Sequence, residues 1–368
     1  MDSNVEQGAR NLLLNCAEMQ SGQSLLILAE DASTGFFETA LVDAISDAAR
    51  ALDIETTVQT VPFHPDVTHP CSKLASSMKS ADRTLFLSRF GDQLRFSSEL
   101  SAVDPVVSYV LDTHALASPF GRAHHQAFVQ LKTVVNAALN AADDIHVTCP
   151  LGTDFRGTGH ISEAQGSEVS VRRFPLSVFT PVPAKAFSGT IAQAGFLTGT
   201  GSNYYSPYTI PLDDILTVTF EGNTLTHLDG SEQDVRRAQR HYDAVANRYG
   251  IDGTYMHSWH AGIHPGCVYA QPAGHFPERW GSGAFGNPRL LHFHTCGAYA
   301  PGEISLNVVD PTITLDGVAV WQDGRLYPER LPGGREILEQ FPCAAAAFDT
   351  PETDVGLSAS GRLSALMQ

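Results

Sequence analysis

Over residues 1–150, short apolar segments alternate with longer stretches in which apolar residues recur every three or four positions. The segment SLLILA at 24–29 and the β-branched segment at 54–61 are typical of buried strands, and the pattern between them predicts a helix over about 36–52. The pattern then predicts two more helix–strand pairs, at 72–79 with 84–88 and at 123–141 with 145–149. Strands that alternate with helices at this spacing predict a mostly parallel, Rossmann-like α/β layer.

Beyond residue 150, glycine and proline become more frequent and strand-like segments lie closer together. Segments 215–220 and 224–228 flank Glu221-Gly222-Asn223, which predicts a hairpin, and further short strands follow residue 303. We therefore predict an α+β domain over residues 151–343, after the Rossmann-like domain over residues 1–150. Residues 344–368 are small, polar and unpatterned, and we expect a mobile tail there.

Composition narrows the class of protein. A length of 368 residues fits two domains, and 43% hydrophobic with 17% charged residues is typical of a folded chain. The net charge of −17 argues against nucleic acid or an anionic membrane as a partner, and no run of about 18 apolar residues predicts a membrane span. The start of the chain lacks the basic-then-apolar pattern of a secretory signal, so we expect a cytoplasmic protein. The six cysteines stand singly, which predicts reduced thiols.

A Rossmann-like layer raises the question of a nucleotide. The turn after the first predicted strand, EDASTG, lacks the glycine fingerprint that lets a backbone approach a pyrophosphate. We therefore expect a small-molecule substrate instead of a nucleotide cofactor. Assembly into a homo-oligomer is left open.

Histidines are concentrated in one stretch of the second half. Six of the fifteen lie at positions 257–294, spaced by three and four (His257, His260, His264) and by two (His292, His294). A strand places His292 and His294 on one face, so both imidazoles can point into one cavity. A lone histidine is more often structural, but six together favour a metal, because imidazole is the commonest transition-metal ligand.

These residues predict a site for one divalent transition metal. The ligand candidates are His260, His264, His292, His294 and Glu303, with His257 as an alternative to His260. Glu303 can equally be an ordinary carboxylate at the edge of a strand. We assign catalytic roles to Glu303, His257 and Tyr205.

Several segments carry a resemblance to a known family. They are ARNLLLNCAEMQSGQSLLIL, VTFEGNTLTHLDG, SWHAGIHPG, LHFHTCG and VVDPTITLDG, between Gly8 and about Leu326. The chain resembles the aminopeptidase T family of metallo-aminopeptidases and its mononuclear-iron relative, 2,5-dihydroxypyridine 5,6-dioxygenase. The resemblance implies a first metal ligand at His257 or His260. The family's later His-x-Asp pair falls on Glu303-Ile304-Ser305, so that motif is absent, and His292 and His294 are left to supply imidazoles.

Three functions follow from this site. Two imidazoles and one carboxylate leave open metal positions, as in non-haem Fe(II) oxygenases, which favours a ring-cleaving dioxygenase of an aromatic or heteroaromatic substrate. The alternative is a hydrolase, aminopeptidase-like or amidohydrolase-like, in which Zn²⁺ or Mn²⁺ activates water and Glu303 acts as the base. The third is a metal-binding protein without enzymatic activity.

Substrate contacts are predicted from residues near these segments. Tyr204 and Tyr205 lie in a glycine-bounded loop that suits a lid, although tyrosines are also ordinary interface residues. Arg156 and His160 follow the domain boundary and suit a substrate carboxylate, although a surface arginine is the commoner outcome. Trp259 is expected to wall the pocket.

Overall fold

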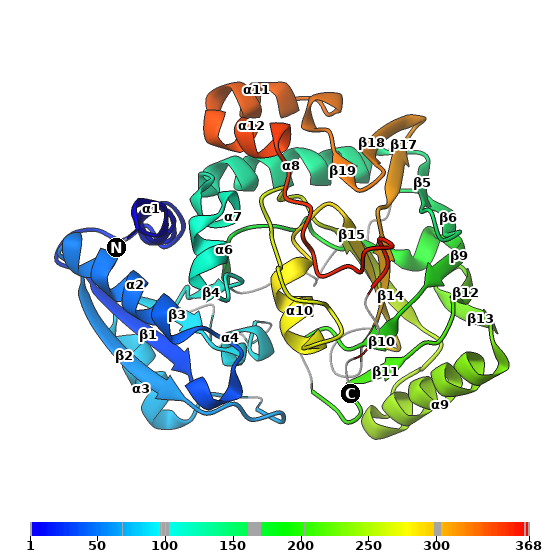
Figure 1. Ribbon diagram of the computed structural model, residues 1–368, viewed down its shortest axis with the longest axis horizontal. Coiled ribbons are helices and arrows are strands. Elements are labelled where there is room, and N and C mark those ends of the chain that lie inside the picture. The colour runs from blue at the N-terminus through cyan, green and yellow to red at the C-terminus, as the bar shows by residue number, and fades with distance from the viewer. Residues whose placement is uncertain are drawn as a thin grey trace.

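The computed structural model describes residues 2–67, 69–95, 97, 100, 103–160, 171–201, 204–297, 303–363 and 366. Its N-terminal part contains a five-stranded parallel sheet in the order β2-β1-β3-β4-β7 (Figure 1). The strands are β1 (Ser24–Glu30), β2 (Glu55–Val61), β3 (Arg83–Leu87), β4 (Val106–Ser108) and β7 (Arg172–Phe174). The helices of this part are α1 (Ser3–Arg10), α2 (Thr39–Ala51), α3 (Ser72–Ser80), α4 (Arg89–Gln93), α6 (Thr113–Ala117) and α7 (Pro119–Arg122).

Helices cover both faces of this parallel sheet, which explains why β1 is apolar along its length. Leu25 and Ile27 pack with α2 in one core cluster, whereas Leu26 and Leu28 pack with α3 in another. Alternate side chains of one strand thus enter two cores, as in a strand that is buried on both faces. The structure confirms the predicted parallel sheet with helices on both faces. The Rossmann-like detail of this layer stays a prediction.

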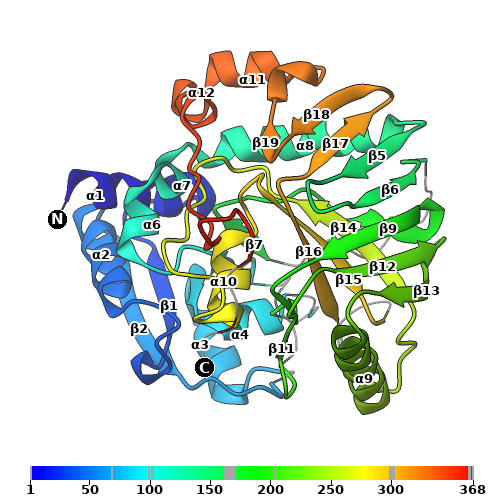
Figure 2. The same cartoon turned by 45° about the vertical axis from the view of Figure 1, so that its right-hand side comes forward.

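The second part is built from two antiparallel sheets (Figure 2). An eight-stranded sheet has the order β13-β12-β9-β6-β5-β17-β18-β19, and a six-stranded sheet has the order β11-β10-β16-β15-β14-β8. The eight strands are β5 (Ile145–Thr148), β6 (Asp154–Gly157), β9 (Ser188–Gln193), β12 (Leu216–Glu221), β13 (Thr224–Asp229), β17 (Thr312–Leu315), β18 (Val318–Gln322) and β19 (Arg325–Leu326). The six are β8 (Val182–Pro183), β10 (Phe196–Thr198), β11 (Thr209–Pro211), β14 (Met256–Ala261), β15 (Leu290–Thr295) and β16 (Ile304–Val309). The helices are α8 (His125–Ala141), α9 (Glu232–Tyr249), α10 (Pro277–Ala284), α11 (Gly334–Gln340) and α12 (Pro342–Asp349).

The strand pairing crosses the boundary predicted at residue 150. β5 pairs with β6 and β17 in the eight-stranded sheet, whereas β7, which lies after the boundary, pairs with β4 in the parallel sheet. The chain therefore passes between the two parts more than once. A single division at residue 150 does not separate the sheets, because local patterns carry no information on which distant strands pair.

The end of the chain also differs from the expectation of an unpatterned tail from residue 344. Residues 342–349 form α12, Val355 is fully buried in a β-bridge with Tyr269, and Leu363 is buried. These residues pack on the second part, so the mobile-tail prediction is corrected for residues 344–363. Residues 364, 365, 367 and 368 lie outside the described residues. Within the part of the chain that is described, no helix is both long and apolar enough to cross a membrane.

Helix α10 ties the two parts of the molecule together through ion pairs. Arg89, at the start of α4, lies 2.5 Å from Glu30 at the end of β1 and 3.1 Å from Glu278 of α10. Arg279 of α10 donates to Asp112 at 2.8 Å. The Arg89–Glu30 pair is almost completely buried, and the guanidinium lies over the Phe63 ring at 3.4 Å.

We predict that Glu30→Gln lowers the free energy of unfolding by about 3 kcal/mol, because it removes the buried charged partner of the Arg89 guanidinium and leaves only the more exposed Glu278. Glu55→Gln is the matched control, since Glu55 is exposed at the start of the neighbouring strand β2 and its substitution should change stability by less than about 0.5 kcal/mol. Urea unfolding of both variants measures the difference. Equal losses in the two variants would contradict the stabilising role of the pair.

Candidate metal centre

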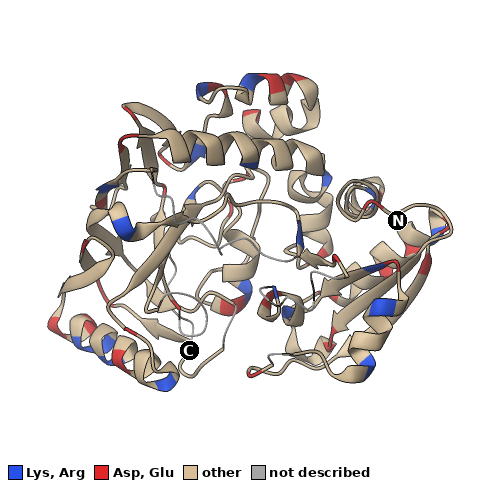
Figure 3. Ribbon diagram, turned by 180° about the vertical axis from the view of Figure 1, so that it is seen from behind, with Lys and Arg blue, Asp and Glu red and all other residues tan. Residues whose placement is uncertain are grey.

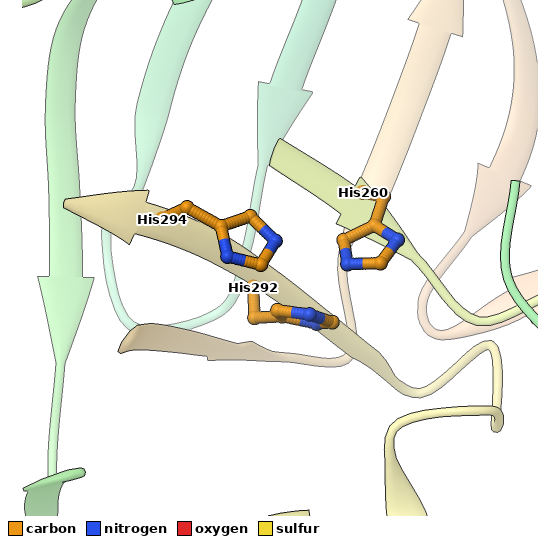
Figure 4. A group of neighbouring side chains, drawn as sticks. All are labelled: His260, His292 and His294. Carbon is orange, nitrogen blue, oxygen red and sulfur yellow. The ribbon is translucent and has the colours of Figure 1, made fainter. Parts of the chain in front are cut away.

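Three histidines of the six-stranded sheet meet at one point. In the antiparallel pairing of β14 and β15, His260 lies directly opposite His292, and His294 follows two residues along the same face. The ring centroid of His260 lies 4.0 Å from that of His292 and 5.1 Å from that of His294 (Figure 4). One ring nitrogen from each lies within 4.8 Å of the other two. The structure therefore brings three of the predicted ligands together.

The opposite face of the same strands explains why the histidines point this way. Trp259, Leu291 and Phe293 alternate with them along β14 and β15 and are fully buried in the main core. Because side chains alternate along a strand, burial of this apolar row directs His260, His292 and His294 to the other face.

Each of the three histidines has at least one buried ring nitrogen that lacks a hydrogen-bond partner in the protein. His260 Nδ1 lies 3.3 Å from the carbonyl oxygen of Phe179, which can only accept, so the proton is assigned to Nδ1 and Nε2 keeps its lone pair. That Nε2 atom, Nδ1 of His292 and both ring nitrogens of His294 are buried without a hydrogen-bond partner. Each such atom costs about 1–3 kcal/mol when it remains unsatisfied. A cation that accepts nitrogen lone pairs fits this donor set.

Burial and neighbouring charges favour the neutral form of two of the three histidines, His260 and His292. Burial, followed by the neighbouring imidazoles, lowers the pKa of His260 and His292 well below the usual histidine value. Neutral imidazole is the form that binds a metal. His260 and His292 thus have both the placement and the protonation that a transition metal needs.

Glu303 lies beside this group. Its Oε1 is 3.3 Å from His294 Nδ1, and its Oε2 accepts a hydrogen bond from the Thr200 hydroxyl. Burial raises its pKa, but His294, Arg95 and Thr200 outweigh burial and lower the pKa to about 2. The structure does not gather Glu303 among the three nitrogens, which differs from the ligand role that we expected. A carboxylate at this distance from one nitrogen of a histidine can orient the ring if the other nitrogen binds a metal.

The nitrogens face a cavity of about 100 Å³ between the two parts of the molecule. His257 lines it because a β-bulge between Met256 and Ser258 re-aims its side chain, and its Nδ1 lies 2.6 Å from Ser258 Oγ. The wall contributed by the parallel sheet and its loops consists of Asp92, Arg95, Tyr109 and Arg173. Sequence reasoning missed all four. Asp92, Arg95 and Tyr109 follow the carboxyl ends of β3 and β4, where open α/β sheets bind ligands, and this position was the available signal.

His264 is not part of the metal group, which corrects its prediction as a ligand. Strand β14 ends at Ala261, and the following turn carries His264 into the core, where its ring stacks on Phe128 at 3.6 Å. Its Nδ1 accepts from the Gly266 backbone N–H at 3.3 Å. A spacing of four places residues together on a helix but not across the end of a strand.

The predicted substrate contacts lie elsewhere, and each is corrected. Arg156 is exposed on β6 and ion-paired with Asp144 at 2.5 Å, and exposed His160 lies 2.9 Å from Asp143. Trp259 is fully buried on the apolar face of β14. Local sequence cannot show which strand edge faces the cavity.

Tyr204 and Tyr205 are not among the residues that line the cavity. Tyr204 is buried, stacks on Tyr208 at 5.3 Å and contacts Phe63 edge-on, which corrects the predicted lid. The Tyr205 hydroxyl donates to the Glu303 carbonyl oxygen at 2.9 Å. Tyr205 therefore positions the Glu303 backbone, in place of the direct catalytic role that we expected.

The fold is that of known enzymes. Solved structures with the same fold include 2,5-dihydroxypyridine dioxygenase from Pseudomonas putida KT2440, at 15% identity and a TM-score of 0.60 over 89% of this chain and 98% of that one. AmpT from Thermus thermophilus matches at 12% identity and a TM-score of 0.51, over 88% of this chain and 98% of that one. No family model and no curated protein sequence matches. The resemblance inferred from the sequence is therefore confirmed for the fold.

We predict that His260→Ala and His294→Ala each sharply lower the metal content of protein purified without chelator, as measured by elemental analysis. His264→Ala is the control. It should keep the metal while lowering the free energy of unfolding by about 3 kcal/mol, because a ring is lost from the core. Unchanged metal content in both His260→Ala and His294→Ala would show that the ligands are other residues.

We predict that Glu303→Gln still binds metal, with an affinity lower by about 10- to 100-fold, because the amide holds the His294 ring less well than the carboxylate. Competition with a chromogenic chelator measures this affinity. Complete loss of metal, as in His260→Ala, would instead make Glu303 a direct ligand.

Proposed function

We propose that the chain is a mononuclear metal-dependent enzyme that acts on a small aromatic or heteroaromatic substrate, with an Fe(II) ring-cleaving dioxygenase favoured. The observation that carries the proposal is the group of three buried imidazoles at a cavity between the two parts of the molecule. The fold shared with 2,5-dihydroxypyridine dioxygenase supports the same conclusion.

The donor set favours one metal over two. Two-metal hydrolases hold their ions about 3.5–4 Å apart with bridging carboxylates. Among the described residues, the group at this point contains three histidines and no carboxylate. Iron(II), when bound, would supply coordination sites for substrate and dioxygen, and Zn²⁺ or Mn²⁺ are the alternatives.

The chain's own residues would have distinct tasks. His260, His292 and His294 would hold the metal, and Glu303 would orient His294. Phe285, whose ring lies 4.3 Å from that of His292, and Val178 would give the cavity an apolar wall against a planar ring. His257 lines the same cavity and is our candidate for proton transfer to or from the substrate.

A metal-dependent hydrolase is the second candidate, and the fold shared with AmpT favours it. In that case a metal-activated water would be the nucleophile, and Glu303 would be the nearest described carboxylate to act as base. The scarcity of carboxylates in the three-nitrogen group weighs against this reading.

We predict that protein purified anaerobically binds iron(II) in place of zinc, one ion per chain, and that nitric oxide added as a dioxygen surrogate gives an iron-nitrosyl signal by electron paramagnetic resonance. His292→Ala should abolish the signal, and Arg156→Gln, which removes a charge far from the cavity, should leave it unchanged. Iron-loaded protein should consume dioxygen with a dihydroxypyridine or a dihydroxybenzoate. Native zinc, together with hydrolysis of leucine 4-nitroanilide under argon, would establish the hydrolase instead.

A further inference from the structure

Arg173 of β7 lines the cavity from the side of the parallel sheet. Its Nε atom is buried and has no hydrogen-bond partner. Among the described residues, no carboxylate forms an ion pair with it, whereas the adjacent Arg172 is paired with Asp104 at 2.7 Å and Glu18 at 2.8 Å. A guanidinium that lines a cavity without a partner is a site for an anion.

The other charged side chains of the cavity already contact partners within the protein. Arg95 lies 2.8 Å from Asp92, and the Tyr109 hydroxyl donates to the other oxygen of the same carboxylate at 2.9 Å. Asp92 therefore neutralises Arg95 and is not available to Arg173. On the opposite wall, Glu303 is held by His294 and Thr200.

Arg173 lies close enough to the proposed metal ligands for its charge to act on them. Besides burial and the neighbouring imidazoles, its charge contributes to lowering the pKa of both His260 and His292. A divalent metal, the ionised Glu303 and Arg173 together leave the cavity with an excess of positive charge. An anionic substrate would neutralise this excess. The positive cavity contrasts with the chain as a whole, which carries a net charge of −17. On the helices, such as α9, acidic and basic residues are interspersed (Figure 3).

We propose that Arg173 binds a carboxylate of the substrate, so that the site takes a ring compound that bears a carboxylate on the side away from the histidines. The inference rests on the proposed function for the placement of the ring at the metal centre. Nε and one terminal nitrogen of the guanidinium form the fork that carboxylates bind in two parallel hydrogen bonds. Arg95 and Tyr109, which are already engaged by Asp92, would shape the wall beside that carboxylate.

The test compares 3,4-dihydroxybenzoate with 3,4-dihydroxybenzamide, which differ only in the charged group. Calorimetric titration under argon, with metal-loaded native protein, should show the acid binding roughly tenfold to a hundredfold more tightly than the amide, in line with a charge-assisted hydrogen bond. Arg173→Gln should remove this preference by weakening the acid and not the amide. Arg173→Lys should retain part of it, because the charge remains and the fork is lost.

Arg156→Gln is the matched control, because it removes the same charge at an exposed position outside the cavity, and it should keep the full preference. Metal content and circular dichroism establish that Arg173→Gln remains folded and loaded. Equal binding of acid and amide by the native protein, or no binding of the acid at millimolar concentration, overturns the inference without any variant.

The same titrations separate this inference from the proposed function. A native protein that carries iron and gives the nitrosyl signal, yet binds the two compounds equally, retains the proposed function and loses the role of Arg173. A protein that carries zinc or no metal, yet prefers the acid through Arg173, loses the proposed function and retains the anion site.

Discussion

Three imidazole lone pairs buried at one point are the constraint on which the rest of the structure depends. Each nitrogen has been removed from water without a protein donor to replace it, a free-energy cost that ordinary cores avoid. A fold retains such a cluster when an occupant satisfies all three atoms together. The surrounding contacts serve this arrangement, because Phe179 fixes the proton of His260 and Glu303 contacts His294.

The register of β14 and β15 decides whether the cluster exists. A slip of one residue would turn His260 into the core and bring Trp259 to the cavity. The large rings on the apolar face oppose such a slip, because Trp259 packs against Phe179 and Phe187 in the main core. Hydrophobic burial on one face therefore determines the geometry of the three histidines on the other.

The part of the site that could be predicted from sequence is the part encoded by local periodicity. The two-residue spacing of His292 and His294 predicts one face of a strand, and a parallel layer follows from the alternation of elements before residue 150. His264 could not be separated from His260, because the end of β14 at Ala261 is set by contacts with distant segments. Arg173 and Tyr109 reach the cavity through the pairing of β4 with β7, which no local pattern encodes.

The proposed metal ligands and the proposed substrate contacts lie on different elements of this fold. The histidines belong to the antiparallel sheet, whereas Arg95, Tyr109 and Arg173 belong to the parallel sheet and its loops. The spacing of the two walls depends on α10, whose Glu278 and Arg279 are ion-paired with Arg89 and Asp112 across the boundary. Because each wall can change while the other is preserved, one architecture can carry different substrates and different reactions. That separation is consistent with a fold shared with a dioxygenase and with AmpT at only 12–15% identity.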